Sequence, residues 1–231
     1  HERLVGSEMC IRDSPMPEEG KQWDVSAIWD GKALGADTAK FQLTYFGRDS
    51  ENLLQLMSRN FFFFYTNAAK AKVNGLEIQA DMSWQKWDVN LKATYTKPKD
   101  VFYDMTKLPG YDSNTIAGSL TYQPQWEGTA RLTYRPDTNW SLFTQLRYVD
   151  WMVTDPIPLT TGAVKRQSSL TTMDVGVKYK FNKSLQLAVG CNDVLNKAND
   201  MYLNMYGNGE IRNIQYPIQG RTYYATLQYT Y

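Results

Sequence analysis

Apolar and polar residues alternate with a period of two along most of the chain. In residues 73–84 (VNGLEIQADMSW), Leu76, Ile78 and Met82 alternate with polar residues such as Glu77 and Asp81. Because successive side chains of a strand point to opposite faces, each such run predicts a strand with one apolar and one polar face. Nine runs of this kind lie at residues 22–30, 40–47, 73–84, 87–96, 126–135, 140–151, 170–181, 185–195 and 220–231.

The connections between these runs are alternately short and long. The short ones are residues 30–37, 85–86, 136–139 and 182–184, and the long ones are 48–72, 97–125, 152–167 and 196–219. In an antiparallel sheet every second connection lies at the same end, so all long connections gather at one end. Transmembrane β-barrels have this asymmetry, with short periplasmic turns and long extracellular loops. A soluble β-sandwich is the alternative, but long structureless loops are uncommon in compact domains.

The final run shows the two faces most clearly. Tyr223, Ala225, Leu227, Tyr229 and Tyr231 share one face, and threonine and glutamine residues dominate the other. This pattern suits a strand that faces lipid on one side and a wet lumen on the other. Trp and Tyr also gather near the ends of the runs, as in an aromatic girdle at a membrane surface. We therefore expect an all-β protein, an antiparallel transmembrane β-barrel, with the last strand running from outside to periplasm.

Composition narrows the class further. The mean hydropathy is −0.52, and no apolar run is long enough for a transmembrane helix. The net charge of +1 gives no field that would attract nucleic acid. The chain has one histidine, His1, and two cysteines, Cys10 and Cys191, so no His/Cys metal cluster or histidine-based triad is expected. No nucleophile elbow or catalytic carboxylate pair stands out. We expect neither an enzyme nor a bound cofactor or metal.

The first residues require separate treatment. The string SEMCIRDS (7–14) resembles a translated sequencing adapter, so we set residues 1–14 aside and expect no disulfide at Cys191. Residues 1–30 also lack the features of a signal peptide, and nine is an odd number of strands, whereas bacterial single-chain barrels have an even number. We therefore expect residues 15–231 to be the C-terminal portion of a larger barrel whose other strands lie upstream.

Three segments carry a family resemblance. Residues 65–84 resemble the N-x-x-x-A-x-x-x-G-x-E strand of TonB-dependent outer-membrane receptors, with Asn67, Ala71, Gly75 and Glu77 at the matching positions. Residues 173–197 are similar to the penultimate hairpin of these receptors, which ends in N-x-h-x-(N/D)-K. Residues 216–231 are similar to their final P-G-R-x-(Y/F) strand, although Ile218 and Gln219 separate the proline from the glycine.

The resemblance implies a barrel of about 22 strands that is plugged by an N-terminal domain. Such receptors take up scarce ligands across the outer membrane of Gram-negative bacteria, driven by the TonB energy-transducing complex, which pulls on the plug. Expected partners are outer-membrane lipid, a ferric siderophore or similar small ligand, the TonB complex through the missing plug, and the barrel assembly machinery, but no nucleic acid. The apolar terminal strand resembles the signal that this machinery reads, carried here by Tyr223, Leu227, Tyr229 and Tyr231.

Aromatic, methionine and basic residues in the long connections are the candidate ligand contacts. Such side chains can grip a flat catecholate ligand and attract an anionic ferric complex, or they can simply pack the loops together. The candidates are Phe102, Tyr103, Lys107, Tyr111, Lys165, Arg166, Met201, Tyr202, Met205, Tyr206, Arg212 and Tyr216. The aromatic run Phe61–Tyr65 suits either a loop patch or the rim of a strand.

Charged residues on the polar faces are expected to line the lumen, as contacts for the plug or as a solvated wall. They are Glu77, Asp81, Asp88, Lys92, Arg131, Arg135, Arg147, Asp174, Lys178 and Lys180. The lack of a histidine beyond His1 favours a ferric siderophore over haem as the ligand. A haem or cobalamin receptor, or a passive porin-like channel, is the alternative.

Overall fold

The strands of one large antiparallel sheet dominate the protein. The computed structural model describes residues 16–59, 62–104, 115–117, 120, 122–153, 166–197, 202–207, 210–215 and 219–230. No helix in this part of the chain is long and apolar enough to cross a membrane. The main path of the sheet contains β1 (Glu19–Gly31), β2 (Thr38–Arg59), β3 (Phe62–Ser83), β4 (Trp87–Asp104), β6 (Trp126–Tyr134), β7 (Trp140–Val149), β10 (Leu170–Lys180), β11 (Leu185–Asn192) and β14 (Thr222–Tyr229).

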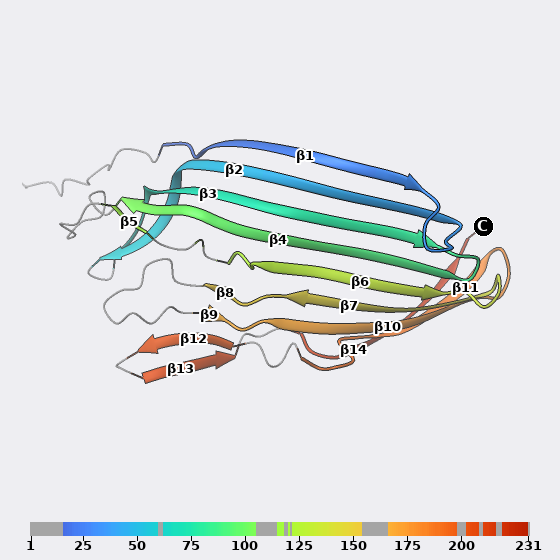
Figure 1. Ribbon diagram of the computed structural model, residues 1–231. Helices are drawn as coiled ribbons and strands as arrows, with labels where there is room; N and C mark the ends of the chain where they lie inside the picture. The colour runs from blue at the N-terminus through green and yellow to red at the C-terminus, as the bar shows by residue number, and fades with distance from the viewer. Residues whose placement is uncertain are drawn as a thin grey trace, which may run out of the picture.

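These nine strands lie in the order in which they occur in the chain, each antiparallel to the next. The predicted number of strands and their pairing are therefore confirmed. The short β5 (Thr115–Ala117) pairs with the outer end of β4. The four short connections all lie at one end of the sheet, at the right of Figure 1, and the long ones lie at the other end.

Two of the short turns are closed by the same device. In the turn between β6 and β7, the carboxylate of Asp137 accepts hydrogen bonds from the backbone N–H groups of Asn139 and Trp140, at 2.8 and 3.0 Å. Between β10 and β11, the side chain of Asn182 accepts from Ser184 and Leu185, both at 2.9 Å. Asp and Asn favour turns because their side chains bond the backbone two or three residues on.

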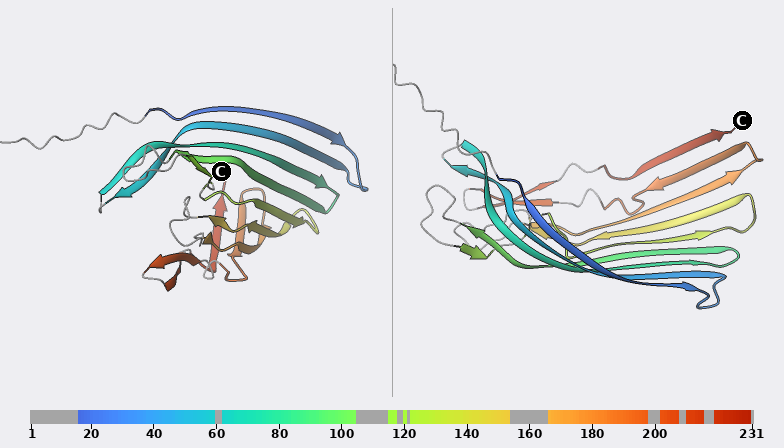
Figure 2. Two further views of the ribbon diagram at one scale, coloured as in Figure 1. Left: turned by 60° about the vertical axis from the view of Figure 1, so that its left-hand side comes forward. Right: turned by 90° about the horizontal axis from the view of Figure 1, so that it is seen from above.

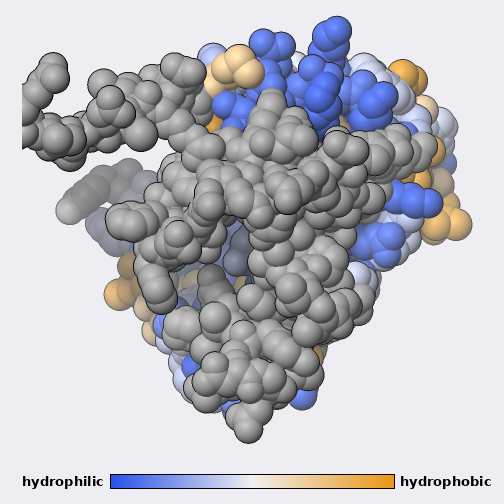
Figure 3. All heavy atoms as spheres, turned by 90° about the vertical axis from the view of Figure 1, so that its left-hand side faces the viewer, coloured by the Kyte–Doolittle hydropathy of each residue, from blue (hydrophilic) through white to orange (hydrophobic). Residues whose placement is uncertain are grey.

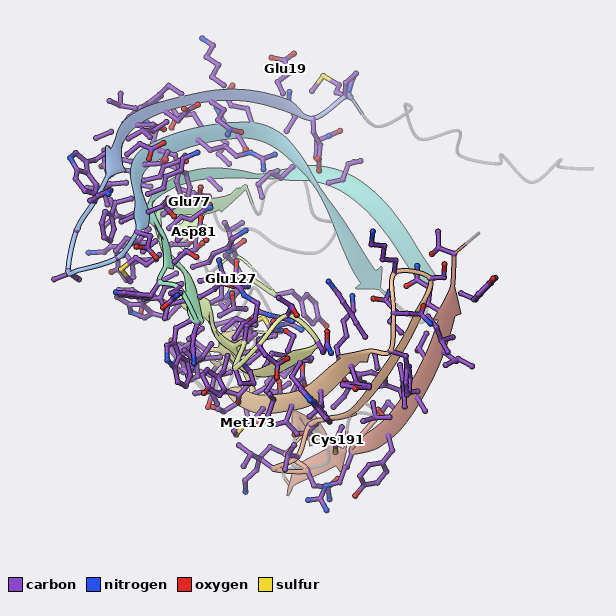
Figure 4. All side chains as sticks on the ribbon, turned by 90° about the vertical axis from the view of Figure 1, so that its right-hand side faces the viewer. Glu19, Glu77, Asp81, Glu127, Met173 and Cys191 are labelled. Atoms are coloured by element: carbon purple, nitrogen blue, oxygen red, sulfur yellow. The ribbon has the colours of Figure 1, made fainter. Side chains whose placement is uncertain are left out.

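The sheet is strongly curved, which gives it a concave and a convex side (Figure 2). Seen from the end with the short connections, Glu77, Asp81 and Glu127 lie on the concave side and Met173 lies on the convex side (Figure 4). Large apolar side chains are exposed on the convex side, among them Val25, Leu43, Ile78, Leu91, Leu132, Leu146, Val189 and Leu227. From the opposite end, apolar residues are visible at the outer edges of the molecule (Figure 3). The sequence periodicity therefore separates the two faces as predicted.

Aromatic pairs mark two levels on the convex face. At the level of the short turns, the ring of Trp87 stacks on Tyr134 and that of Trp140 lies against Tyr179, with centroids 4.2 and 4.5 Å apart. Nearer the other end, Tyr95 packs on Trp126 at 4.6 Å. Trp87 and Tyr95 lie on the same strand. At about 3.3 Å per residue and a tilt of about 40°, their separation corresponds to a band height of roughly 20 Å, close to the apolar band of an outer-membrane barrel.

The prediction of a long loop at residues 48–72 is wrong. Residues 48–59 continue β2 and residues 62–72 belong to β3, so the two strands stay paired as far as Arg59 and Phe62. The aromatic run from Phe62 onwards is thus the start of a strand. Beyond the level of Tyr95 and Trp126 the apolar alternation of the sequence stops, although the backbone pairing continues.

Other long connections also contain strands. Residues 97–104 extend β4, and parts of 152–167 and 196–219 form a second, four-stranded sheet. Its members are β8 (Met152–Val153), β9 (Arg166–Gln167), β12 (Tyr202–Gly207) and β13 (Glu210–Gln215), in the order β13-β12-β9-β8. This small sheet lies at the end with the long connections (Figure 1).

Candidate functional site

A row of polar residues crosses the concave face from β1 to β10. The strand register makes its members direct cross-strand neighbours, so that Asp81 faces Asn90, Asn90 faces Arg131, and Arg131 faces Gln145. We call it the luminal polar row, and it consists of Asp30, Lys40, Asp81, Asn90, Arg131, Gln145 and Asp174. Acidic and basic members alternate along it, an arrangement that favours cross-strand attraction.

Side-chain hydrogen bonds join neighbouring members at two places in this row. The carboxylate of Asp81 accepts from the amides of Gln79 and Asn90, each at 2.7 Å. The guanidinium of Arg131 donates to Gln145 at 3.3 Å and lies 4.0 Å from the centre of the Phe143 ring. Two residues that the sequence assigns to the lumen, Asp81 and Arg131, thus each form a side-chain hydrogen bond to a neighbouring strand within the same row.

An ion pair lies at the end of the concave face near the short turns. Arg135 donates to both carboxylate oxygens of Asp88, at 2.6 Å for one bond, and the hydroxyl of Ser83 donates to the same carboxylate at 2.6 Å. The hydrogen bond to Asp88 raises the pKa of Arg135 above its ordinary value. The pair fixes the start of β4 to Arg135, the residue that follows β6.

Higher on the concave face is a polar cleft of about 680 Å³ between β1 and β6. Its charged lining residues are Asp24, Glu77, Glu127 and Arg48, and most of the others carry hydroxyl or amide groups. Three carboxylates against one guanidinium give the cleft an excess of negative charge. It suits polar or cationic groups of whatever fills the lumen, and it does not suit an anionic ligand.

Of the twelve candidate ligand residues, seven lie on strands and five are outside the described residues. Lys107, Tyr111, Lys165, Met201 and Tyr216 are outside the described residues. Phe102 and Tyr103 lie on the outer part of β4, and Arg166 begins β9. Tyr202, Met205 and Tyr206 lie on β12, and Arg212 lies on β13.

The backbone pairing brings three of the predicted loops together. Gln167 of β9 pairs with Leu203 of β12 and with Met152 of β8, which joins the connections 152–167 and 196–219 in one sheet. The N–H of Tyr122, in the connection 97–125, donates to the carbonyl of Val153 at 2.8 Å. Within the small sheet, Met205 and Arg212 are direct cross-strand partners. The register therefore places candidate residues from separate connections at one end of the sheet, and their role in binding stays a prediction.

Two of the family motifs contact each other at the same end. The backbone N–H of Arg221, which follows Gly220, donates to the side chain of Asn196 at 3.1 Å, and the guanidinium donates to the carbonyl of Val194 at 2.5 Å. The residues after β11 form a tight loop in which Asp193 and Asn196 have positive φ angles of 48° and 55°. Sequence reasoning identified both motifs but not this contact, which links the end of β11 to the start of β14.

Among the described residues, no group of three or more histidine, cysteine or acidic side chains is placed to hold a metal ion. Cys191 is a buried free thiol.

A curved antiparallel sheet with an apolar convex face, two aromatic levels and a charged concave face is the wall of a transmembrane β-barrel. Over residues 14–194, the sequence matches the family described as "TonB dependent receptor-like, beta-barrel". The chain belongs to this family, whose members are outer-membrane proteins of Gram-negative bacteria, and the convex face is the side that meets lipid.

Solved structures agree on the fold. The copper transporter OprC matches with a TM-score of 0.65 at 15% identity, over 95% of this chain and 32% of that one. The siderophore receptor PiuA from Acinetobacter baumannii has a TM-score of 0.64 at 17% identity, over 93% and 29%. A G324V mutant of the ferric enterobactin receptor PfeA from Pseudomonas aeruginosa has a TM-score of 0.64 at 18% identity, over 93% and 31%. The chain thus spans about a third of each structure. Comparison with curated protein sequences gives no significant match.

Proposed function

We propose that this chain is part of an outer-membrane receptor that takes up a ferric siderophore by active transport. The observation that carries the proposal is the gathering of three long connections at the outer end of a barrel wall whose lumen side is polar. These connections supply tyrosine, methionine and basic residues for a flat, anionic ligand. Several matched structures of the same fold are siderophore receptors, which supports this choice of ligand.

The concave face would contact another part of the protein that fills the lumen. The luminal polar row and the cleft offer carboxylates, amides and the half-buried guanidinium of Arg131 to whatever occupies the lumen. In the complete receptor we expect this occupant to be an N-terminal plug, through which the TonB complex would supply energy. The anionic ligand would bind above the cleft, because the negative charge around Glu77 and Glu127 would repel it.

Arg212 provides a test of the ligand class. In the complete receptor, Arg212→Ala should raise the Kd for a ferric siderophore about tenfold or more, because a hydrogen bond to a charged group typically contributes about 1.5–3 kcal/mol. Arg212→Lys should retain part of the affinity because it keeps the charge. Lys183→Ala is the matched control, since it removes a cation from the short turn between β10 and β11, at the other end of the sheet from Arg212. Binding is measured by titration of purified receptor with a panel of ferric siderophores.

The same panel separates the alternatives. Haem, cobalamin and Cu²⁺ are titrated in parallel, and copper is included because OprC shares the fold. If the receptor bound one of these ligands and no siderophore, the proposed ligand class would be wrong. Uptake of radioactive iron that continues without the TonB complex would instead indicate a passive channel.

A further inference from the structure

Strand β2 carries a bulge at the point where it leaves the aromatic band. Its pairing with β1 ends at Glu51, opposite Glu19, and its register with β3 shifts between Ser50 and Leu54. Asn52 within the bulge has a φ angle of 57°, in the left-handed region. A bulge of this kind interrupts the hydrogen-bond ladder and bends the strand. The backbone of the segment before β1, residues 16–18, therefore passes the bulge without a regular partner strand.

Asn67 of β3 occupies this gap with its side chain, and only 8% of the residue is exposed. Its amide oxygen accepts from the backbone N–H of Met16 at 2.7 Å, and its amide nitrogen donates to the carbonyl of Met16 at 2.8 Å. The same nitrogen donates to the carbonyl of Asn52 at 2.6 Å. In a sheet, a pair of bonds to the N–H and C=O of one residue comes from the backbone of the neighbouring strand. The carboxamide of Asn67 replaces that backbone.

A second contact crosses the gap in the other direction. The carboxylate of Glu18 accepts a hydrogen bond from the backbone N–H of Leu54 at 2.7 Å, just after the bulge. A side chain from β3 thus holds the segment before β1, and a side chain from that segment holds β2. Lys70 and Glu51 form an ion pair nearby at 3.4 Å, but both side chains are more than half exposed, so it adds little.

We propose that Asn67 is a latch on the extracellular side of the barrel. It ties the lead-in to β1 (residues 16–18) to the arm, which we define as residues 53–59 of β2 with residues 62–69 of β3. The lead-in and the arm lie at the same end of the sheet, the end with the long connections (Figure 1). The latch makes two separate extracellular parts move as one unit. It rests on the family's orientation in the membrane and is independent of the ligand.

The chemistry of the latch requires a carboxamide. An aspartate at position 67 keeps the acceptor for the N–H of Met16 but has no donor for the carbonyls of Met16 and Asn52, and it places a charge in a buried position. An alanine leaves all three backbone groups without this partner. Because only the backbone of residue 16 is bonded, the identity of the side chain there does not matter.

Hydrogen exchange of the complete receptor in detergent tests the latch. Asn67→Asp should speed exchange in peptides that cover residues 16–20 and 52–56 at least about tenfold, because these amides lose local protection. Exchange in β6 and β7 should stay unchanged. Asn74→Asp is the matched control, since Asn74 lies on the same strand and its amide donates at 3.2 Å to the hydroxyl of Tyr45, away from the lead-in.

A second variant covers the case in which Asn67→Asp does not assemble. Glu18→Ala, at the exposed half of the latch, should speed exchange at Leu54 and also at residues 16–20, because the two halves hold the same pair of segments. Exchange at residues 16–20 that remains at the wild-type rate in either variant would overturn the proposal. Acceleration spread evenly over all strands would also overturn it, because it would indicate a general loss of stability.

Discussion

At the scale of single residues, glycines on the concave face make space for aromatic rings. A Cβ atom at Gly75 would lie 2.2 Å from the ring of Phe46 and 2.7 Å from the carbonyl oxygen of Tyr95. Gly176 and Gly190 are cross-strand partners, and the rings of Phe143 and Tyr224 cover them in the same way. The glycine of the family motif thus has a packing reason: the ring beside it needs the space.

Gly75→Ala should therefore destabilise the barrel by roughly 1–3 kcal/mol, as extra groups forced into a packed site usually do. The ring can move, but the carbonyl of Tyr95 belongs to the neighbouring strand and cannot move without disturbing the ladder. Gly20→Ala is the control, because a Cβ at Gly20 meets nothing closer than 3.7 Å. The measurement is the urea midpoint of the complete receptor in lipid vesicles. Equal midpoints for the two variants would contradict this account.

At the scale of the strands, the convex face of the sheet requires apolar side chains and the concave face accepts polar and charged ones. Leu91 lies midway along β4 between Trp87 and Tyr95 and is 39% exposed on the convex face. Its neighbour Asn90 lies on the concave face and bonds Asp81. A one-residue step along the strand therefore changes the surroundings from lipid to a wet, charged wall.

Leu91→Arg should cost roughly 2–4 kcal/mol, the usual penalty for a cation at the midplane on the lipid face of a barrel. Thr94→Arg is the matched control, and it should have little effect because position 94 lies on the concave face opposite the carboxylates of Glu77 and Glu127. Folding yields into vesicles of defined thickness give the comparison. A folding yield of Leu91→Arg equal to that of the control would show that position 91 does not face lipid.

The strands also show how far sequence reasoning reaches. Alternation such as that of Leu76 and Ile78 is imposed by lipid on one face and water on the other, so it predicts the strands inside the membrane. Leu53 and Leu54 are adjacent apolar residues in β2, where this asymmetry ends, and there the prediction of a loop is wrong. Hydrogen bonds between backbones hold such a strand, and they leave no periodic trace in the side chains.

The candidate site, too, is predictable from the sequence only in part. The alternation of apolar and polar positions along each strand is enough to predict that Asp81 and Arg131 lie on the lumen side. That both belong to the same cross-strand row depends on the register between strands, which the sequence does not encode locally. The latch at Asn67 is further from prediction, because its partners lie 51 and 15 residues away in the chain. The family motif includes Asn67, but the role of its side chain becomes clear only from the bulge in β2.

At the scale of the whole molecule, the terminal strand β14 forms one edge of the sheet. It pairs with β11 from Thr222 to Tyr229, and its apolar side chains are among the most exposed, with Tyr223 at 76% and Leu227 at 67%. Tyr231, which the sequence places in the assembly signal, lies outside the described residues. The remaining members of the predicted signal stay a prediction, but they share the convex face.

Replacing Tyr231 with Asp in the complete receptor should lower its level in the outer membrane severalfold, because a charge at this position would disrupt the apolar face of the predicted assembly signal. Thr230→Asp is the control, since residue 230 belongs to the opposite face. Outer-membrane fractions, compared with and without heating before electrophoresis, report the folded amount. Wild-type levels of the Tyr231 variant would remove this residue from the signal.

The length of the arm has a consequence beyond the barrel. From Tyr45 at the edge of the aromatic band, β2 continues to Arg59, a path of at most roughly 45 Å at about 3.3 Å per residue. A large body, such as a phage or an antibody, that approached this end of the barrel would therefore meet paired strands as well as loops. The proposed latch at Asn67, at the base of the arm, would then also govern how this surface of paired strands is presented.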